Sequence, residues 1–184
     1  MSRAGKYPVK LSEGVVASIA EDKLVVKGPK GELVVPLDTK HAGLVDVKIE
    51  EGCVAVTPKD ADDKTSSAMW GTMTRNIRNA VEGVTHGFSK DMRMNGVGYK
   101  ASVSGKKFTL VVGFSHDVVM EVPEGITVTM GETPTEFTIS GIDKCAVGLF
   151  ADKIHKIRKA DPYTWQFAFG RHCSNLLTAQ TEHT

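Results

Sequence analysis

Short apolar runs separated by glycine-bearing turns constrain this chain most, and residues 95–123 show them most clearly. Apolar and polar residues alternate in residues 99–104 and again in residues 108–112, which is the period of a half-buried strand. Gly105 and Gly113 stand in the turns that follow these two runs, because glycine takes positive φ at little cost. A third apolar run follows, so the stretch predicts an antiparallel meander of three strands.

The same pattern occurs earlier, in residues 15–36, where residues 17–19 align with residues 101–103. Two further strand-like segments also have counterparts: residues 45–49 and 53–57 correspond to residues 126–130 and 136–140. Each half then closes with a helical pattern. An internal duplication explains this order better than one continuous sheet. We therefore expect an α+β fold of two tandem, similar small domains, each an antiparallel sheet with one main helix packed on it.

Apolar residues at three- and four-residue spacing mark the two helices. The first is expected from about Asp62 to Val81, with Asp62 or Asp63 as its amino-terminal cap and Gly83 at its end. Its buried stripe comprises Met69, Met73, Ile77, Ala80 and Val81. The second is expected over residues 143–159, with Asp143 as its cap and a buried stripe of Val147, Phe150, Ile154 and Ile157. The predicted domains are residues 1–83 and 84–163, followed by an atypical tail, residues 164–184.

Composition excludes several classes of protein. Hydrophobic residues make up 41% of the 184 residues, which is enough for packed cores. No apolar run approaches the length of a membrane span, and residues 1–10 lack the apolar centre of a secretory signal. The three widely spaced cysteines suit a reducing compartment and argue against a disulfide framework or a zinc cluster.

No catalytic constellation is recognisable, and we expect neither enzymatic activity, cofactor nor metal. Residues 96–98 lack the third glycine of a dinucleotide fingerprint, and a strand rather than a helix follows them. The six histidines show no metal-ligand spacing. Cys145, in the first turn of a helix, is the one position where a reactive thiol is conceivable.

Net charge is only +1, so any nucleic-acid-binding face must be local. Residues 84–159 hold ten basic and eight acidic side chains, a net charge of +2. The most basic stretch gathers near the end of the second helix, at Lys153, His155, Lys156, Arg158 and Lys159. Cations there complement the helix dipole, and a solvated face is the alternative to a phosphate-contacting surface.

Several segments, in order, resemble the bacterial-type family of large-subunit ribosomal protein number six, over about residues 2–163. They are Ser-Arg-Ala-Gly-Lys at 2–6, Val-Lys-Gly-Pro-Lys-Gly-Glu-Leu at 26–33, Met-Trp-Gly-Thr at 69–72, Gly-Val-Gly-Tyr-Lys-Ala at 96–101, Gly-Phe-Ser-His at 113–116, Val-Pro-Glu-Gly-Ile at 122–126 and Gly-Ile-Asp-Lys at 141–144.

The resemblance implies a structural constituent of the large ribosomal subunit, in a bacterial cytoplasmic or an organellar ribosome. It implies binding to large-subunit ribosomal RNA near the sarcin–ricin loop, mainly through the second domain, with neighbouring ribosomal proteins and elongation factors as partners and no membrane. The expected RNA-binding residues are Arg3, Lys6, Gly98, Tyr99, Lys100, Gly113, Ser115, His116, Lys144, Lys153, Lys156, Arg158, Lys159 and Tyr163.

Alternatives stay open at this point. Residue types alone make the turn residues ordinary turns with solvated lysines. Tyr99 and Phe108 lie on neighbouring strands, where their placement favours core packing, with a stacking platform for RNA as the alternative. An RNA- or protein-binding module outside the ribosome, and a small enzyme using Cys145 or a histidine, are the rival classes of function.

The tail departs from the family after Asp-Pro-Tyr at 161–163, where the family continues with a Lys-Gly-rich, basic segment that helps hold the RNA. Residues 164–171 show none of that pattern, although Trp165, Phe167 and Phe169 alternate as in a strand. Either this lineage has a different tail, or the reading frame of the gene sequence shifts there. The abruptness of the break favours the second explanation.

Overall fold

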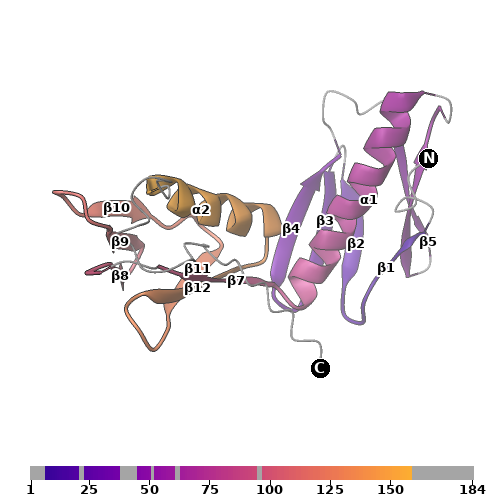
Figure 1. Ribbon diagram of the computed structural model, residues 1–184. Coiled ribbons are helices and arrows are strands. Elements are labelled where there is room, and N and C mark those ends of the chain that lie inside the picture. The colour runs from indigo at the N-terminus through magenta and orange to yellow at the C-terminus, as the bar shows by residue number, and fades with distance from the viewer. Residues whose placement is uncertain are drawn as a thin grey trace. The chain divides into compact units, whose positions relative to one another are not determined.

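The computed structural model describes residues 7–20, 23–37, 45–50, 52–60, 63–94 and 97–158. The chain divides after Gly87 into two units, and each combines two three-stranded antiparallel sheets with one helix (Figure 1). The α+β class and the duplicated halves predicted from the sequence are confirmed. The division lies four residues beyond the end of the predicted first domain, residue 83.

The first unit contains two separate sheets with the strand orders β1-β6-β5 and β2-β3-β4. Their strands are β1 (Val9–Lys10), β2 (Val16–Ala20), β3 (Lys23–Gly28), β4 (Gly31–Pro36), β5 (Val45–Glu50) and β6 (Cys53–Pro58). Helix α1 (Lys64–Thr85) packs on β3, β4 and β6. Alternation decides which side of each strand faces it: Leu24 and Val26 of β3 are fully buried, whereas Lys23 and Lys27 are exposed.

The second unit repeats this plan with the strand orders β7-β12-β11 and β8-β9-β10. Its strands are β7 (Phe88–Arg93), β8 (Lys100–Ser104), β9 (Lys107–Val111), β10 (Val118–Glu121), β11 (Ile126–Met130) and β12 (Glu136–Gly141). Helix α2 (Lys144–Ile157) packs on β7 and β12. The predicted meander over residues 99–122 is therefore confirmed as β8, β9 and β10.

Strands β1 and β7 were not predicted. Val9 of β1 pairs with Val54, and β7 pairs with β12 along its whole length. β1 has two residues, too few to show alternation, and in β7 the half-buried Lys90 interrupts the apolar side of the strand. Both strands are held by pairing with a partner distant in the sequence.

Helix α1 begins as predicted and ends later than predicted. The Asp63 side chain caps it, accepting hydrogen bonds from the backbone N–H of Thr65 at 3.1 Å and of Ser66 at 3.4 Å. Gly83, the predicted end, is buried inside the helix. The helix ends instead at Thr85 with His86 as its C-cap, and Gly87 follows with a φ of 75°, in the left-handed region typical of the residue after a helix cap.

Both helices bury most of the predicted stripe. Met73, Ile77, Ala80 and Val81 are buried in α1, but Met69 is only half-buried. In α2, Val147, Phe150 and Ile154 are buried and Ile157 is partly buried. Asp143 caps α2 as predicted, accepting a hydrogen bond from the Cys145 N–H at 2.8 Å, and the helix ends at Ile157 rather than at residue 159.

The hairpin between β3 and β4 donates hydrogen bonds to carbonyl groups at the end of α1. Its register pairs Gly28 with Gly31, so the loop has two residues, Pro29 and Lys30. The Lys30 N–H donates to the Val84 carbonyl at 3.0 Å, and the Lys30 ammonium donates to the His86 carbonyl. This segment lies within the Val-Lys-Gly-Pro-Lys-Gly motif, which thus supplies donors to the last carbonyls of a helix.

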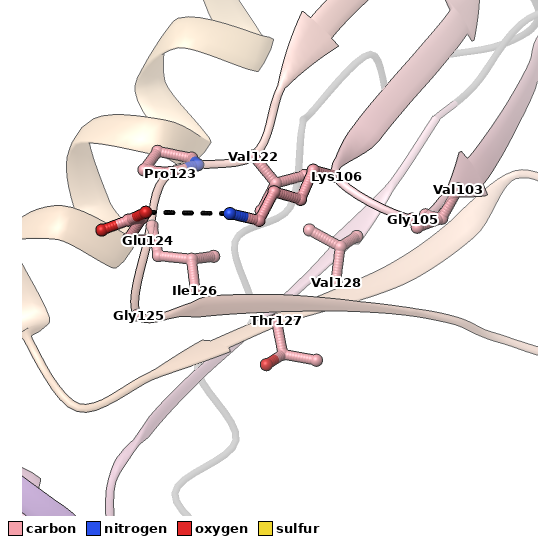
Figure 2. Close-up of a pocket in the computed structure, with 10 residues that line it drawn as sticks. All are labelled: Val103, Gly105, Lys106, Val122, Pro123, Glu124, Gly125, Ile126, Thr127 and Val128. Atoms are coloured by element: carbon pink, nitrogen blue, oxygen red, sulfur yellow. Dashed lines mark ion pairs between the residues drawn. The ribbon is translucent and has the colours of Figure 1, made fainter.

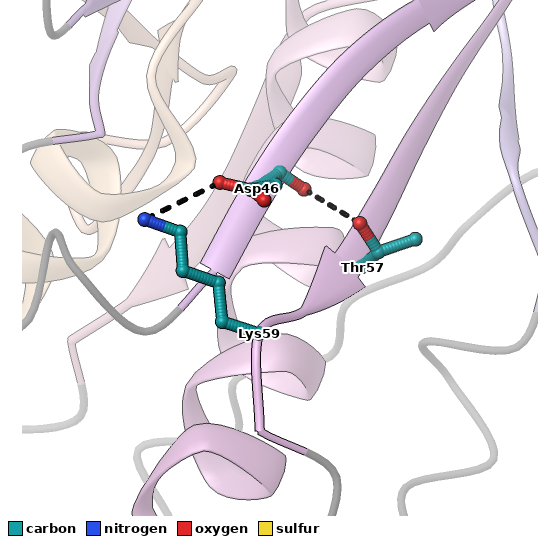
Figure 3. Close-up of polar contacts among 3 residues, drawn as sticks. All are labelled: Asp46, Thr57 and Lys59. Carbon is teal, nitrogen blue, oxygen red and sulfur yellow. Dashed lines mark hydrogen bonds and ion pairs between the residues drawn. The ribbon is translucent and has the colours of Figure 1, made fainter.

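Two surface contacts connect β5 and β6 at the end of their hairpin opposite the turn. The Lys59 ammonium lies 3.6 Å from the Asp46 carboxylate, and the Thr57 hydroxyl donates a hydrogen bond to the Asp46 carbonyl at 3.5 Å (Figure 3). All three side chains are substantially exposed to solvent, so we expect the ion pair to contribute less than about 1 kcal/mol to stability. The hydrophobic side chains of the first unit, not this contact, hold the hairpin in place.

The core of the second unit is aromatic. Phe108 of β9 lies 5.0 Å from Phe137 of β12 and 6.3 Å from Phe150 of α2, measured between ring centroids. All three are buried. Each ring comes from a different element, so the cluster joins both sheets to the helix. The surface loops of the unit are built around this cluster.

Candidate nucleic-acid interface

The loop between β9 and β10, residues 112–117, contains three of the predicted RNA-binding residues, Gly113, Ser115 and His116. Gly113 has a φ of 74°, which a residue with a side chain rarely adopts. A Cβ atom there would lie 3.5 Å from the Tyr99 ring and 3.7 Å from the guanidinium of Arg158. The backbone at Gly113 thus lies against two other predicted residues, Tyr99 and Arg158.

Arg158 connects this loop to the end of α2. Its Nη1 donates to the Gly113 carbonyl at 3.3 Å, and its guanidinium carbon lies 5.1 Å from the centroid of the Phe114 ring. Arg158 directly follows the last residue of α2 and has an extended backbone, so the helix end directs its side chain to a loop 45 positions away. A planar guanidinium suits both contacts at once.

Tyr99, which directly precedes β8, and Lys100, its first residue, lie near the Gly113 loop. Tyr99 is half-buried and packs against the aromatic core. Lys100 is exposed and pairs in register with Val111, two residues before Gly113. Gly98 is exposed with a φ of 79°, and a Cβ atom there would meet nothing within 4 Å. Folding therefore collects most of the predicted second-domain residues around one end of α2.

Two of the predicted lysines lie on the exposed face of α2. Lys156 forms an ion pair with Asp152 one turn earlier, at 2.6 Å, and Lys153 is exposed beside it. The hydrogen bond from Lys156 lowers the pKa of Asp152 below its usual value. This carboxylate offsets part of the positive charge, which supports the solvated-face interpretation for Lys156 more than for Lys153.

Lys144 does not join the cluster. It is the first residue of α2, about 21 Å along the helix from Arg158 at the usual rise per residue. Its ammonium lies 5.1 Å from the centroid of the Phe88 ring in β7. Lys144 therefore lies at the opposite end of α2 from the contact between Arg158 and Gly113. Arg3, Lys6, Lys159, Tyr163 and the predicted tail, residues 164–184, lie outside the described residues.

Sequence reasoning did not single out Phe114, and it favoured core packing over a stacking role for Tyr99 and Phe108. Phe108 is 0% exposed, which makes core packing the correct interpretation for it. Phe114 is 42% exposed, and its ring lies nearly parallel to that of His116, with 6.0 Å between the centroids and 16° between the planes. The position of Phe114 directly after a turn glycine could have indicated its exposure, because a residue in a turn lacks the alternation that marks the buried side of a strand.

Other kinds of site find little support in the part of the chain that the structure describes. It holds no group of three or more histidine, cysteine or acidic residues able to bind a metal ion. None of the described helices is long and apolar enough to cross a membrane. Cys145 is exposed and Cys53 half-buried, and both are free thiols.

A cavity of about 350 Å³ lies beside the β8–β9 turn (Figure 2). Ile126 and Val128 line it while Thr127 points to the other side of β11, and the exposed ion pair between Lys106 and Glu124 lies at its edge. No predicted RNA-binding residue lines it. We assign it no role.

Comparison with known proteins decides the family. The family described as ribosomal protein L6 matches residues 11–87 and 95–166, most of the chain and both halves of the duplication. The chain belongs to the ribosomal protein L6 family. The second match extends three residues into the segment where we expected the family pattern to stop.

Individual members of the L6 family align with this chain over most of their length. The chain is 44% identical over 163 residues to a protein from Zymomonas mobilis and 46% identical over 165 residues to one from Rhodopseudomonas palustris, covering 89% of each chain. A relative from a Chelativorans species is 44% identical over the same share. Each of these relatives is named large ribosomal subunit protein uL6. The L6 family is one of non-enzymatic ribosomal proteins, as the sequence predicted.

Proposed function

We propose that this protein is a structural constituent of the large ribosomal subunit and binds its ribosomal RNA through the second unit, near the sarcin–ricin loop. The hydrogen bond from Arg158 to the Gly113 carbonyl carries the proposal, because it brings a cation to the glycine loop. Lys100 adds a second cation on the neighbouring strand, where it pairs with Val111. Membership of the L6 family and the names of its relatives support the ribosomal setting.

Binding would rest on shape and phosphate recognition. The exposed glycines at 98 and 113 leave backbone accessible where an RNA strand can approach closely. Lys100 and Arg158 supply cations beside these turns, and Lys153 supplies another along α2. Such groups recognise the RNA backbone and its 2′-hydroxyls rather than base sequence. A local surface of this kind is compatible with a net charge of only +1.

The protein would brace RNA helices against which elongation factors press. Neighbouring ribosomal proteins and those factors would be its protein contacts. It would work in a bacterial cytoplasmic ribosome or an organellar one, since the relatives named above are bacterial. Co-sedimentation with large subunits through high-salt washes is the result expected of a resident subunit component.

A salt titration of RNA affinity tests the interface. The full chain binds a large-subunit ribosomal RNA fragment containing the sarcin–ricin region, and the logarithm of the association constant is measured against that of the salt concentration. Each phosphate contact contributes about 0.7–0.9 to the slope. We expect Lys100→Ala/Lys153→Ala/Lys156→Ala to bind more weakly, with a slope shallower by about 2, mainly through Lys100 and Lys153 because Asp152 already offsets the charge of Lys156.

The matched control removes three exposed lysines of the first unit: Lys23→Ala/Lys48→Ala/Lys64→Ala. Both triple variants change net charge equally, so a general electrostatic effect would alter both slopes. The proposal predicts a clear change only in the second-unit variant. Equal slopes for the two variants, or wild-type affinity no better than for unrelated RNA, would contradict it.

A further inference from the structure

We propose that Phe114 and His116, held in place by Arg158, form a stacking platform for one unpaired base of the bound RNA. This inference rests on the proposed function, because it assigns a chemical role to part of the same surface. It differs in kind from that function: phosphate contacts depend on charge, whereas stacking on aromatic rings depends on flat apolar area.

The exposure of Phe114 is the first observation. Phe108, Phe137 and Phe150 of the same unit are all at most 2% exposed, whereas Phe114 is 42% exposed. The fold therefore has an aromatic core to which Phe114 does not belong. Single exposed apolar side chains are common on protein surfaces, so the exposure of Phe114 shows only that its ring is accessible to a partner, and the geometry around it carries the proposal.

The ring geometry is the second observation. The planes of Phe114 and His116 differ by only 16°, and their centroids are 6.0 Å apart. That separation is within the range of offset aromatic pairs, so the two rings present nearly parallel faces rather than an edge against a face. A nucleobase is a flat ring system of comparable size, and it stacks on such faces with little regard to its identity.

Arg158 is the third observation, and it is a positioning residue. The hydrogen bond to the Gly113 carbonyl and the approach to the Phe114 ring hold the loop from two sides. A guanidinium has five N–H donors, and the contact to Gly113 occupies one of them. The others are suited to the phosphate of the nucleotide whose base stacks on the rings.

The charge around the platform favours RNA over a protein partner. The cations Lys100 and Arg158 lie beside the loop, and Asp117 is the one acidic residue of the loop itself. A flat aromatic surface bordered by cations matches the two recurring features of single-stranded nucleic-acid sites. Flexible single-stranded segments of ribosomal RNA supply bases that are free to stack.

The test compares Phe114→Ala with Met130→Ala, which removes a similarly exposed apolar side chain from β11 outside the candidate interface. Removing one base–aromatic stack weakens binding by about 5- to 150-fold. We expect that loss for Phe114→Ala with the salt slope unchanged, recovery of affinity in Phe114→Trp, and little effect of Met130→Ala. Phe114 is exposed, so the variant should fold, which circular dichroism checks.

A second measurement identifies the base. Each unpaired nucleotide of the RNA fragment is replaced in turn by an abasic one, and wild type and Phe114→Ala are titrated with every RNA. One abasic position should weaken binding of the wild type and leave Phe114→Ala unaffected, because the stacked pair is already broken.

The outcomes separate the two proposals. If the wild type binds with a salt slope that the lysine variant reduces, but Phe114→Ala binds equally well, the platform is wrong and the proposed function stands. If no abasic position couples to Phe114 although the Phe114→Ala variant binds weakly, the partner of the ring is not a base. If the wild type fails to bind specifically, the proposed function itself fails.

Discussion

At the scale of single residues, glycine decides how closely segments approach. Gly28 ends β3 against the last turn of α1, and a Cβ atom there would lie 2.7 Å from Cγ2 and 3.0 Å from the carbonyl oxygen of Val84. Val84 is 0% exposed and belongs to the helix, so it has no room to move. The glycine is required by packing rather than by its own backbone angles.

We therefore expect Gly28→Ala to lower the free energy of unfolding of the first unit by about 1–3 kcal/mol, the usual cost of overpacking. Chemical denaturation followed by circular dichroism measures it. Gly148→Ala is the comparison, because Gly148 lies in α2 with nothing within 4 Å of its would-be Cβ. That change should be stabilising by up to about 1 kcal/mol. Equal effects of the two substitutions would refute the packing argument.

At the scale of elements, the caps and hairpin contacts determine where the helices start and stop. Asp63 caps α1, and its carboxylate accepts hydrogen bonds from the backbone N–H and the hydroxyl of Thr65 at 3.1 and 3.0 Å. These bonds, the backbone one first, lower the pKa of Asp63 below its usual value of 3.8. At the other end, Lys30 donates to the last carbonyls of α1.

The lowered pKa of Asp63 has a definite consequence for stability. Because the folded pKa lies below the unfolded one, the stabilisation is complete above about pH 4 and is lost as pH falls through the folded pKa. We expect the difference in melting temperature between wild type and Asp63→Asn to shrink or reverse on acidification to about pH 2. Asparagine keeps the capping oxygen but does not titrate.

Thermal unfolding at several pH values measures this difference. Asp60→Asn serves as the control, since Asp60 precedes the helix and does not cap it. A difference between wild type and Asp63→Asn that stays constant with pH would show that the charged carboxylate adds nothing to the cap.

At the scale of the whole molecule, each half of the duplication has a hydrophobic core of its own. The second unit surrounds Phe108, Phe137 and Phe150, whereas the first buries Leu24, Val26, Val54, Ile77 and Val84. The two units share strand order but differ in their cores, since the three buried phenylalanines all belong to the second unit and the described core residues of the first are not aromatic. Domains with separate cores open by separate local transitions.

We accordingly expect Phe108→Leu to destabilise the second unit by about 1–3 kcal/mol through the space it leaves. Hydrogen exchange should accelerate at the amides of β9 and β12, while those of β3 in the first unit keep their protection. Native-state exchange with mass spectrometry resolves the two units. An equal loss of protection in β3 would show that the halves unfold as one.

The sequence alone determined the features that depend on local pattern. Period-two alternation and glycine turns predicted the meander over residues 99–122, and helical spacing predicted most of the buried stripes of α1 and α2. The order of these patterns revealed the duplication, and the motifs at 26–33 and 113–116 revealed the family. Each of these signals lies within a few residues of the position it describes.

Only the tertiary structure decided what depends on distant partners. Strands β1 and β7 are held by pairing with β6 and β12. Helix α1 continues past Gly83, which is buried within it, and ends at Thr85. Likewise, Arg158 meets Gly113 across 45 positions, and Phe114 stays exposed while the other three rings lie in the core. Long-range pairing leaves no trace in a local pattern, which is why the local sequence pattern did not indicate the exposed pair of rings at Phe114 and His116.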